Sequence, residues 1–203
     1  RVTFHALTVT STSRFMSADS SSSGNDSPSA ILGMMRIGLG YDSHRLVPGG
    51  PLRIGGTQIP FDKHLDGHSD ADVLLHAVSD ALLGAAALGD IGHWFPDTDP
   101  ANQNKDSGEL LVACYEKVRQ QGYQLVNIDC VVHAQHPKIG PHREEIRGRI
   151  ADLLEVNIGC ISVKAKTGEG LGPVGRGEMI QAQCAVLLQA VTMGTGETEN
   201  RTE

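Results

Sequence analysis

Alternating apolar and polar positions predict five β-strands in this chain, because successive side chains of a strand point to opposite faces. Pro48-Gly49-Gly50-Pro51 has the composition of a turn and separates the first two strands. The last apolar run also fits a helix, but Gln181 and Gln183 alternate with apolar positions, which favours a strand. The strands are expected at residues 35–41, 52–59, 125–133, 161–165 and 179–188.

Longer runs of helix-forming residues predict three helices between these strands. Ser69 offers an N-cap for the first helix, and Asp72 follows three residues later, close to a capping box. The helices are expected near residues 69–88, 107–121 and 141–154, the second ending at Gly122 and the third opening at Pro141. Strands mixed with helices predict an α/β (α+β) fold, a single domain with a mixed β-sheet covered on one face by helices.

The two ends of the sequence show no such periodicity. Residues 1–34 are rich in Ser and Thr and predict a disordered tail, and residues 191–203 predict a polar C-terminal tail. The domain is therefore expected at residues 35–190. The first tail also fits a transit peptide or translation from a start codon upstream of Met35, and it lacks the apolar run of a secretory signal.

Composition narrows the function classes. The 203 residues are 39% hydrophobic, enough for one ordinary core, and carry a formal charge of −7. This charge argues against a protein that binds nucleic acid through a basic face, so an anionic substrate would need metal ions. The four cysteines form no C-x-x-C pair, and no apolar run approaches the roughly 18 residues of a membrane span.

A first set of candidate residues has the spacing of metal ligands. Asp42 and His44 lie two positions apart at the end of a predicted strand, so their side chains share one face. His76 lies on the first helix between Asp72 and Asp80, in a polar stripe with a spacing of four. Two imidazoles and one carboxylate would bind Zn²⁺ with an open fourth position, the arrangement of catalytic zinc. A solvated helix face beside an unrelated turn is the alternative.

Two further segments have the composition of phosphate-binding loops. His68 and Ser69 precede a helix N-terminus, where backbone N–H groups bind anions, although Ser69 could simply cap that helix. Residues 164–169 combine two lysines, Thr167 and Glu169 around a glycine. This composition suits a diphosphate held with Mg²⁺, although such a stretch also fits a plain hairpin turn.

Several of these segments together resemble one known family across nearly all of residues 35–190. The chain is similar to the 2-C-methyl-D-erythritol 2,4-cyclodiphosphate synthase family of bacterial type. The blocks that carry the resemblance, in order, are Gly40-Tyr41-Asp42-Ser43-His44, His68-Ser69-Asp70-Ala71-Asp72-Val73, Asp80-Ala81-Leu82-Leu83-Gly84-Ala85, Asp90-Ile91-Gly92-His93-Trp94-Phe95-Pro96-Asp97, Ala134-Gln135-His136-Pro137-Lys138, Lys164-Ala165-Lys166-Thr167-Gly168-Glu169 and Gly175-Arg176-Gly177-Glu178.

The resemblance implies a role for each matching residue. Asp42, His44 and His76 would bind Zn²⁺, and Glu169 would bind Mg²⁺ or Mn²⁺ between two substrate phosphates. Lys166 and Thr167 would act beside the diphosphate. Substrate binding would involve His68, Ser69, Asp90, Ile91, Gly92, Asp97, Ala134, Pro137, Lys138, Ile139, Gly140, Lys166, Thr167 and Arg176. Pro173 stands where relatives often have an aromatic residue facing a central cavity of the assembly.

The implied activity is that of a phosphorus-oxygen lyase of the non-mevalonate isoprenoid pathway. Such an enzyme converts 4-diphosphocytidyl-2-C-methyl-D-erythritol 2-phosphate to 2-C-methyl-D-erythritol 2,4-cyclodiphosphate and releases CMP. The family assembles as a homotrimer with active sites at subunit interfaces. Residues 171–177 resemble bacterial more than plant members, which favours the cytoplasm. A zinc-dependent phosphoester hydrolase and a non-catalytic nucleotide-binding trimer are the alternatives.

Overall fold

A computed structural model of the chain describes residues 35–96, 98–102 and 105–191. The two predicted tails, apart from Val191, and Asp97 lie outside the described residues. The elements are β1 (Met35–Pro48), β2 (Leu52–Ile54), β3 (Thr57–Ile59), β4 (Lys63–Leu65), α2 (Val73–Ala85), α3 (Ile91–Trp94), a 3₁₀ turn (Pro100–Asn102), α4 (Ser107–Gln120), β5 (Tyr123–His133), a 3₁₀ turn (Gly140–His142), α5 (Arg143–Leu154), a 3₁₀ turn (Ile158–Cys160), β6 (Ile161–Lys166), α6 (Gly172–Gly175) and β7 (Met179–Ala190).

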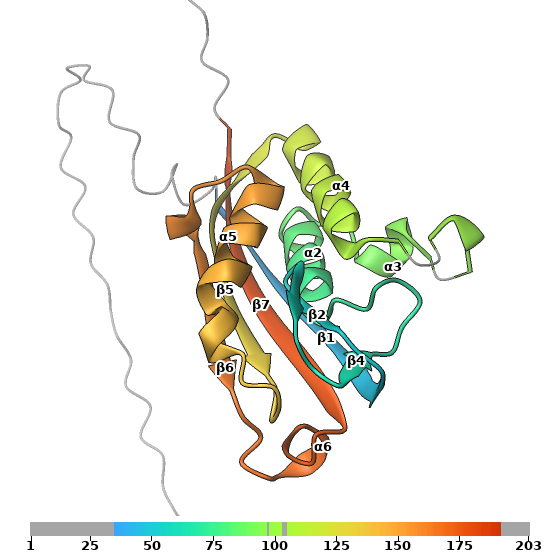
Figure 1. Ribbon diagram of the computed structural model, residues 1–203. Coiled ribbons are helices and arrows are strands. Elements are labelled where there is room, and N and C mark those ends of the chain that lie inside the picture. Colours follow the sequence, from blue (N-terminus) through green and yellow to red (C-terminus); the bar gives the residue numbers. More distant parts are fainter. Residues whose placement is uncertain (1–34, 97, 103–104, 192–203) are drawn as a thin grey trace, which may run out of the picture.

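Five strands form one sheet in the order β4-β1-β7-β5-β6. Only β5 and β6 pair in parallel among these neighbours, so the described sheet is mixed. Helices α2, α4 and α5 lie on one side of it (Figure 1). The predicted class, a mixed sheet covered on one face by helices, is confirmed.

Helix α2 packs directly on the backbone of β1. A Cβ atom built on Gly38 would stand 1.9 Å from the Ala81 carbonyl oxygen, and one on Gly40 would stand 1.9 Å from the Ala77 carbonyl oxygen. Only glycine allows this approach. Because side chains alternate along a strand, Asp42 and His44 continue the same face of β1 and point toward the same helix.

Two predicted strands have different bounds in the structure. The first was expected to end at Tyr41 but continues to Pro48, because its distal half pairs with β7 and then with β4. Residues 52–59 were expected to form one strand but form the hairpin β2–β3. Gly55 and Gly56, both at positive φ, make its turn, and this local turn chemistry overrides the apolar run on either side.

The first helix begins later than predicted. Asp72, not Ser69, is its N-cap, and the helix ends at Ala85, before the expected Leu88. The Asp72 carboxylate is fully buried and accepts hydrogen bonds from Leu74 N and Leu75 N at 3.1 Å each. It also accepts from Gly55 N at 2.8 Å and Gly56 N at 2.6 Å. One side chain therefore caps α2 and fastens the β2–β3 turn to it.

Replacement of Asp72 by alanine is expected to lower the free energy of unfolding by on the order of 3 kcal/mol. An N-cap is worth about 1 kcal/mol, and each buried N–H group left unpaired costs roughly 1–3 kcal/mol. Asp106→Ala is the matched control, because Asp106 caps α4 from a half-exposed position and accepts from Gly108 N. We expect a loss of about 1 kcal/mol there. Urea titration of the metal-free chain measures both values, and equal losses would contradict the double role of Asp72.

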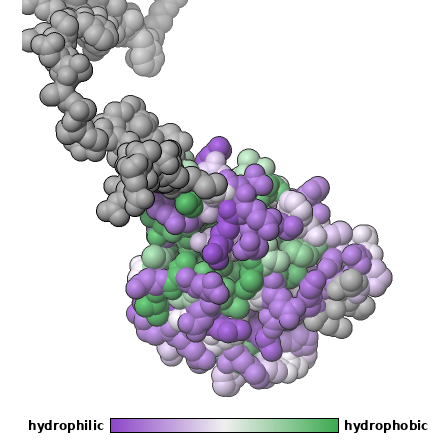
Figure 2. Space-filling model, turned by 90° about the horizontal axis from the view of Figure 1, so that it is seen from above, coloured by the Kyte–Doolittle hydropathy of each residue, from purple (hydrophilic) through white to green (hydrophobic). Residues whose placement is uncertain are grey.

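The opposite face of β1 is apolar and uncovered in the single chain. Ile37, Leu39 and Tyr41 are 72%, 76% and 52% exposed. In the view from above, hydrophobic side chains also reach the surface in patches between hydrophilic ones (Figure 2). Contiguous exposed apolar surface commonly marks an interaction site. Among the described residues, no helix is long and apolar enough to span a membrane.

Candidate active site

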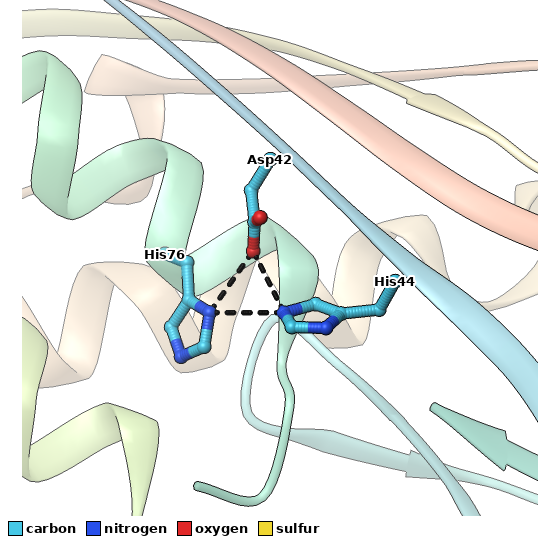
Figure 3. Close-up of side chains that lie close together, drawn as sticks. All are labelled: Asp42, His44 and His76. Atoms are coloured by element: carbon cyan, nitrogen blue, oxygen red, sulfur yellow. Dashed lines mark hydrogen bonds and ion pairs between the residues drawn. The ribbon is translucent and has the colours of Figure 1, made fainter. Parts of the chain in front are cut away.

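Asp42, His44 and His76 meet where the distal half of β1 passes the first turns of α2 (Figure 3). Asp42 Oδ2 lies 3.0 Å from His44 Nε2 and 2.9 Å from His76 Nδ1. The two ring nitrogens are 3.3 Å apart. The structure thus brings together the three residues whose spacing predicted a metal site, and they form a group able to hold a metal ion.

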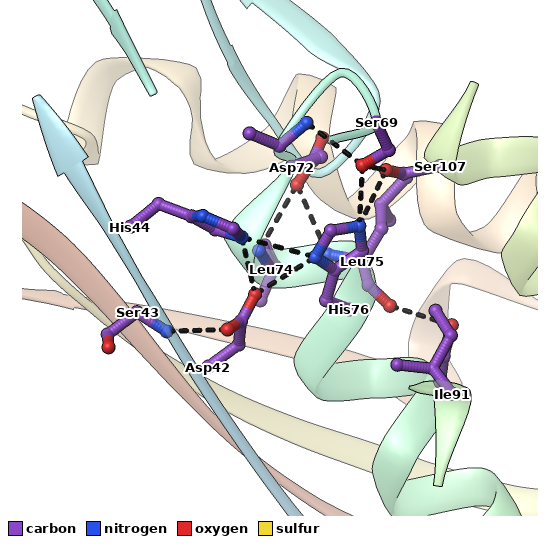
Figure 4. A network of polar contacts seen from close by, with 12 residues as sticks. Asp42, Ser43, His44, Ser69, Asp72, Leu74, Leu75, His76, Ile91 and Ser107 are labelled. Atoms are coloured by element: carbon purple, nitrogen blue, oxygen red, sulfur yellow. Dashed lines mark hydrogen bonds and ion pairs between the residues drawn. The ribbon is translucent and has the colours of Figure 1, made fainter. Parts of the chain in front are cut away.

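Each ring has a hydrogen-bond partner on its outer side, and Figure 4 shows those of His76, which are Ser69 and Ser107. His44 Nδ1 is 2.9 Å from the Asp66 carbonyl oxygen, which can only accept, so in the neutral ring Nδ1 carries the proton and Nε2 has the free lone pair. His76 Nε2 is 3.1 Å from Ser69 Oγ and 2.9 Å from Ser107 Oγ.

When both imidazoles are neutral and His76 is protonated at Nε2, three lone-pair atoms converge. Two imidazole nitrogens and a carboxylate oxygen would then face one another with no hydrogen between them. Such a donor set repels itself without a cation and suits Zn²⁺, which prefers nitrogen and oxygen ligands of this kind. The residues present therefore fit a zinc ion.

Without a cation, the two rings can instead donate hydrogen bonds to Asp42, and these bonds shift the pKa values in the cluster. Burial alone would raise the pKa of Asp42, but hydrogen bonds with His44 and His76 hold it well below its ordinary value. Burial lowers the pKa of His44, yet the neighbouring Asp42 carboxylate raises it overall. Asp42 is therefore a carboxylate at neutral pH, and the site favours positive charge beside it.

A cleft of about 400 Å³ opens from the cluster. Of the residues predicted to bind substrate, His68, Ser69, Ile91 and Gly92 line it beside the three candidate ligands. Asp90 is not among the residues that line the cleft, and its carboxylate caps α3 by accepting from His93 N at 2.8 Å. Residues 68 and 69 and residues 91 and 92 thus line the same cleft as the candidate metal ligands.

The start of α3, at Ile91, is fastened to α2 by Asp80. Its carboxylate accepts from Ile91 N at 2.8 Å, and burial raises the pKa of Asp80. Asn102 and Leu110 also line the cleft, although sequence reasoning missed both. Neither belongs to a local chemical motif, so only the folded chain places them there.

A second, separate cleft of about 220 Å³ lies at the end of β5 and β6. It shares no lining residue with the first. Pro137 is not among the residues that line this cleft but is next to Lys138, which does, and the His136–Pro137 peptide bond is cis. The predicted substrate-binding residues found in its lining are Ala134, Lys138, Ile139, Gly140, Lys166 and Thr167.

Glu169 and Arg176 lie in the segment between β6 and β7. Glu169 has a φ of +50°, in the left-handed region that costs a non-glycine residue energy, and its carboxylate accepts from Thr167 Oγ1. Arg176 pairs with Glu178, with Nε–Oε1 and Nη2–Oε2 distances of 2.7 and 3.0 Å. Neither Glu169 nor Arg176 lines either cleft of the single chain.

Solved structures share this fold. The bifunctional IspDF from Campylobacter jejuni matches with a TM-score of 0.75 and 43% identity, over 77% of this chain and 42% of that one. A 2C-methyl-D-erythritol-2,4-cyclodiphosphate synthase in a CDP-bound form matches with a TM-score of 0.71 and 40% identity, over 76% of this chain and all of that one. The CDP complex of IspF from Plasmodium falciparum gives 0.69 and 33%, over 78% and 98%.

Sequence relatives agree with the structural ones. The 2-C-methyl-D-erythritol 2,4-cyclodiphosphate synthase of Geobacillus kaustophilus is 58% identical over 156 residues, 77% of this chain and 99% of the relative. That of Bacillus cytotoxicus is 57% identical over 156 residues, again 77% of this chain and 99% of the relative. The model of the YgbB family matches residues 35–189. The chain therefore belongs to the YgbB family, and the resemblance to cyclodiphosphate synthases seen in its sequence blocks is confirmed.

Proposed function

We propose that this chain is a cyclodiphosphate synthase that converts 4-diphosphocytidyl-2-C-methyl-D-erythritol 2-phosphate to 2-C-methyl-D-erythritol 2,4-cyclodiphosphate and CMP. The observation that carries the proposal is the cleft in which Asp42, His44 and His76 converge beside His68 and Ser69. A metal ion and hydrogen-bond donors in this cleft would suit an anionic substrate. The similar relatives bear the name of this synthase.

The candidate ligands divide between two ions. Asp42, His44 and His76 would hold Zn²⁺, and Glu169 would hold Mg²⁺ or Mn²⁺, a hard cation suited to carboxylate and phosphate oxygens. When bound, these ions would neutralise charge on the reacting phosphates, whose mutual repulsion opposes ring closure.

The chain's own residues would orient the substrate. Ser69 and His68 line the cleft, where the hydroxyl and the ring would donate to the 2-phosphate. The backbone at Ile91 and Gly92, held by Asp80, would fix the sugar-alcohol hydroxyls opposite. Residues 134–140, with Lys166 and Thr167, would bind the cytidine diphosphate half. Two structural relatives were solved with CDP, which supports a cytidine-linked substrate.

The reaction would then be an intramolecular phosphoryl transfer. An oxygen of the 2-phosphate forms a bond to the β-phosphorus, and the bond from that phosphorus to the bridging oxygen breaks, so the electron pair leaves with CMP. No protein nucleophile takes part. Holding the two phosphates in line lowers the barrier by about 7–11 kcal/mol in well-oriented intramolecular systems, so positioning would supply most of the catalysis.

Two observations support an assembly with shared active sites, and the family resemblance makes that assembly a homotrimer. The uncovered face of β1 presents Ile37, Leu39 and Tyr41 to solvent, an apolar surface that a neighbouring subunit would bury. The metal-binding cleft and the cleft at residues 134–140 are separate within one chain, yet the substrate must contact both. We infer that each complete site combines the metal cleft of one subunit with the second cleft of its neighbour.

Phosphorus NMR of the purified chain with the cytidylyl substrate and Mg²⁺ tests the activity. We expect the resonances of a cyclic diphosphate together with CMP. The candidate metal cluster would also suit a zinc-dependent phosphoester hydrolase, which would release an open-chain phosphate instead. Hydrolysed product without the cyclic diphosphate would overturn the proposal.

Glu169→Gln is expected to lower turnover by about 10- to 100-fold, because it weakens the second metal ion while leaving the zinc ligands intact. Part of the activity should return at high Mg²⁺ or Mn²⁺, since an amide oxygen still binds weakly. Initial rates over a Mg²⁺ titration measure both effects. Glu145→Gln, an exposed change in the first turn of α5, is the control. A Glu169→Gln enzyme indifferent to divalent-ion concentration would remove Glu169 from the metal site.

A further inference from the structure

Ser107 lies directly behind the candidate zinc site and does not line the metal cleft. It is the first residue of α4, has no exposed surface and is absent from the lining of the metal cleft. Its Oγ is nevertheless 2.9 Å from His76 Nε2, on the side of the ring away from Asp42 (Figure 4). Ser107 therefore touches a candidate ligand but not the reacting groups.

The direction of this hydrogen bond follows from the second partner of Ser107. Its Oγ also contacts Asp70 Oδ1, and an ionised carboxylate can only accept. The single hydroxyl proton of Ser107 is thus donated to Asp70. The lone pairs of Ser107 Oγ then accept from His76 Nε2–H, which leaves Nδ1 unprotonated and facing Asp42.

Asp70 is itself held in place. Its Oδ1 accepts from Ser107 N at 3.3 Å and from Asp72 N at 3.4 Å. Its Oδ2 lies 3.7 Å from Nη1 of Arg53, a residue of β2. Both carboxylate oxygens have partners, so Asp70 is fixed as the acceptor at the outer end of a chain that runs through Ser107 to His76.

We propose that Ser107 is a positioning residue that, with Asp70, holds His76 in the orientation and tautomer that bind the metal ion. The inference rests on the proposed function, because it assumes that Asp42, His44 and His76 bind Zn²⁺. Partners of metal-bound histidines raise the basicity of the ring and reduce its freedom to rotate, and their loss typically costs about 10- to 100-fold in metal affinity.

Zinc affinity of the full chain, measured by competition with a chromogenic chelator, tests the proposal. We expect Ser107→Ala to bind zinc about 10- to 100-fold more weakly than wild type, and Ser107→Thr, which keeps the hydroxyl, to recover part of the loss. Ser79→Ala is the matched control. Ser79 is equally buried, but its hydroxyl donates to the Leu75 carbonyl within α2 and not to His76. Its affinity should stay at the wild-type value.

A second variant keeps the test decisive if Ser107→Ala does not fold, as judged by the melting temperature of the metal-free chain. Asp70→Ala removes the acceptor of the Ser107 proton, so that proton can be donated to His76 Nε2 and the wrong tautomer becomes accessible. It should also weaken zinc binding. Unchanged affinity in both variants, or an equal loss in Ser79→Ala, would overturn the role of Ser107. A wild-type chain that binds no zinc would instead overturn the metal site on which the inference rests.

Discussion

Replacement of His76 by alanine is expected to remove turnover while the chain keeps its fold. A bound metal ion contributes several kcal/mol of charge stabilisation, and each 1.36 kcal/mol is tenfold in rate, so the loss should be on the order of 10³-fold or more. The fold should survive because the buried residues of α2 that pack on β1, such as Ala77 and Ala81, are unchanged.

The measurement is CMP release with and without added zinc, together with the zinc content of the purified protein. His64→Ala serves as the control, since His64 is an exposed histidine in β4 that contacts only the Gly49 carbonyl in its described hydrogen bond. We expect this control to retain zinc and near-normal rates. Near-normal turnover of His76→Ala in metal-replete buffer would exclude His76 from the site.

Local sequence predicted most of the regular structure because most elements carry a clear period. The strands at β5, β6 and β7 and the helices α4 and α5 were placed within a few residues. The alternation of Gln181 and Gln183 with buried neighbours correctly favoured a strand for β7. Each of these elements packs one face into the core and leaves the other face polar, so its sequence carries the period of a strand or a helix.

The prediction was wrong where tertiary contacts override local pattern. The distal half of β1 carries Asp42, Ser43 and His44, whose polarity hides a strand that is held by pairing with β7. Ser69 looks like a helix cap, but the buried Asp72 takes that position because it can also bind the β2–β3 turn. Neither outcome is visible without knowing which segments meet.

The sequence predicted the three candidate metal ligands but not the residue that holds one of them in place. Strand spacing placed Asp42 and His44 on one face, the polar stripe of the first helix added His76, and the family resemblance supported all three as ligands. Ser107 had no such signal, because a serine at the start of a helix ordinarily caps or solvates it. Its contact with His76 depends on α4 packing against α2, which brings residues 31 positions apart within hydrogen-bond distance.

Mixing two inactive variants is expected to restore activity if each active site is shared between subunits. His44→Ala removes a candidate ligand in the metal cleft. Gly140→Trp fills the second cleft, and a side chain at Gly140 meets no atom of its own chain within 4 Å at the Cβ position, so the subunit should still fold. An interface that joins the metal cleft of the Gly140→Trp chain to the second cleft of the His44→Ala chain would be intact in both halves.

The size of the rescue follows from the symmetry of a cyclic trimer, in which every interface is head-to-tail and therefore directed. In a random equal mixture, each half of an interface is the intact one half of the time, so about one interface in four is complete. We expect about a quarter of wild-type CMP release after the subunits have exchanged, and none from either variant alone. Exchange is verified by native mass spectrometry of variants that differ in mass. A mixture that exchanges subunits and remains inactive would place the whole site within one chain, because no combination of subunits could then unite an intact metal cleft with an intact second cleft.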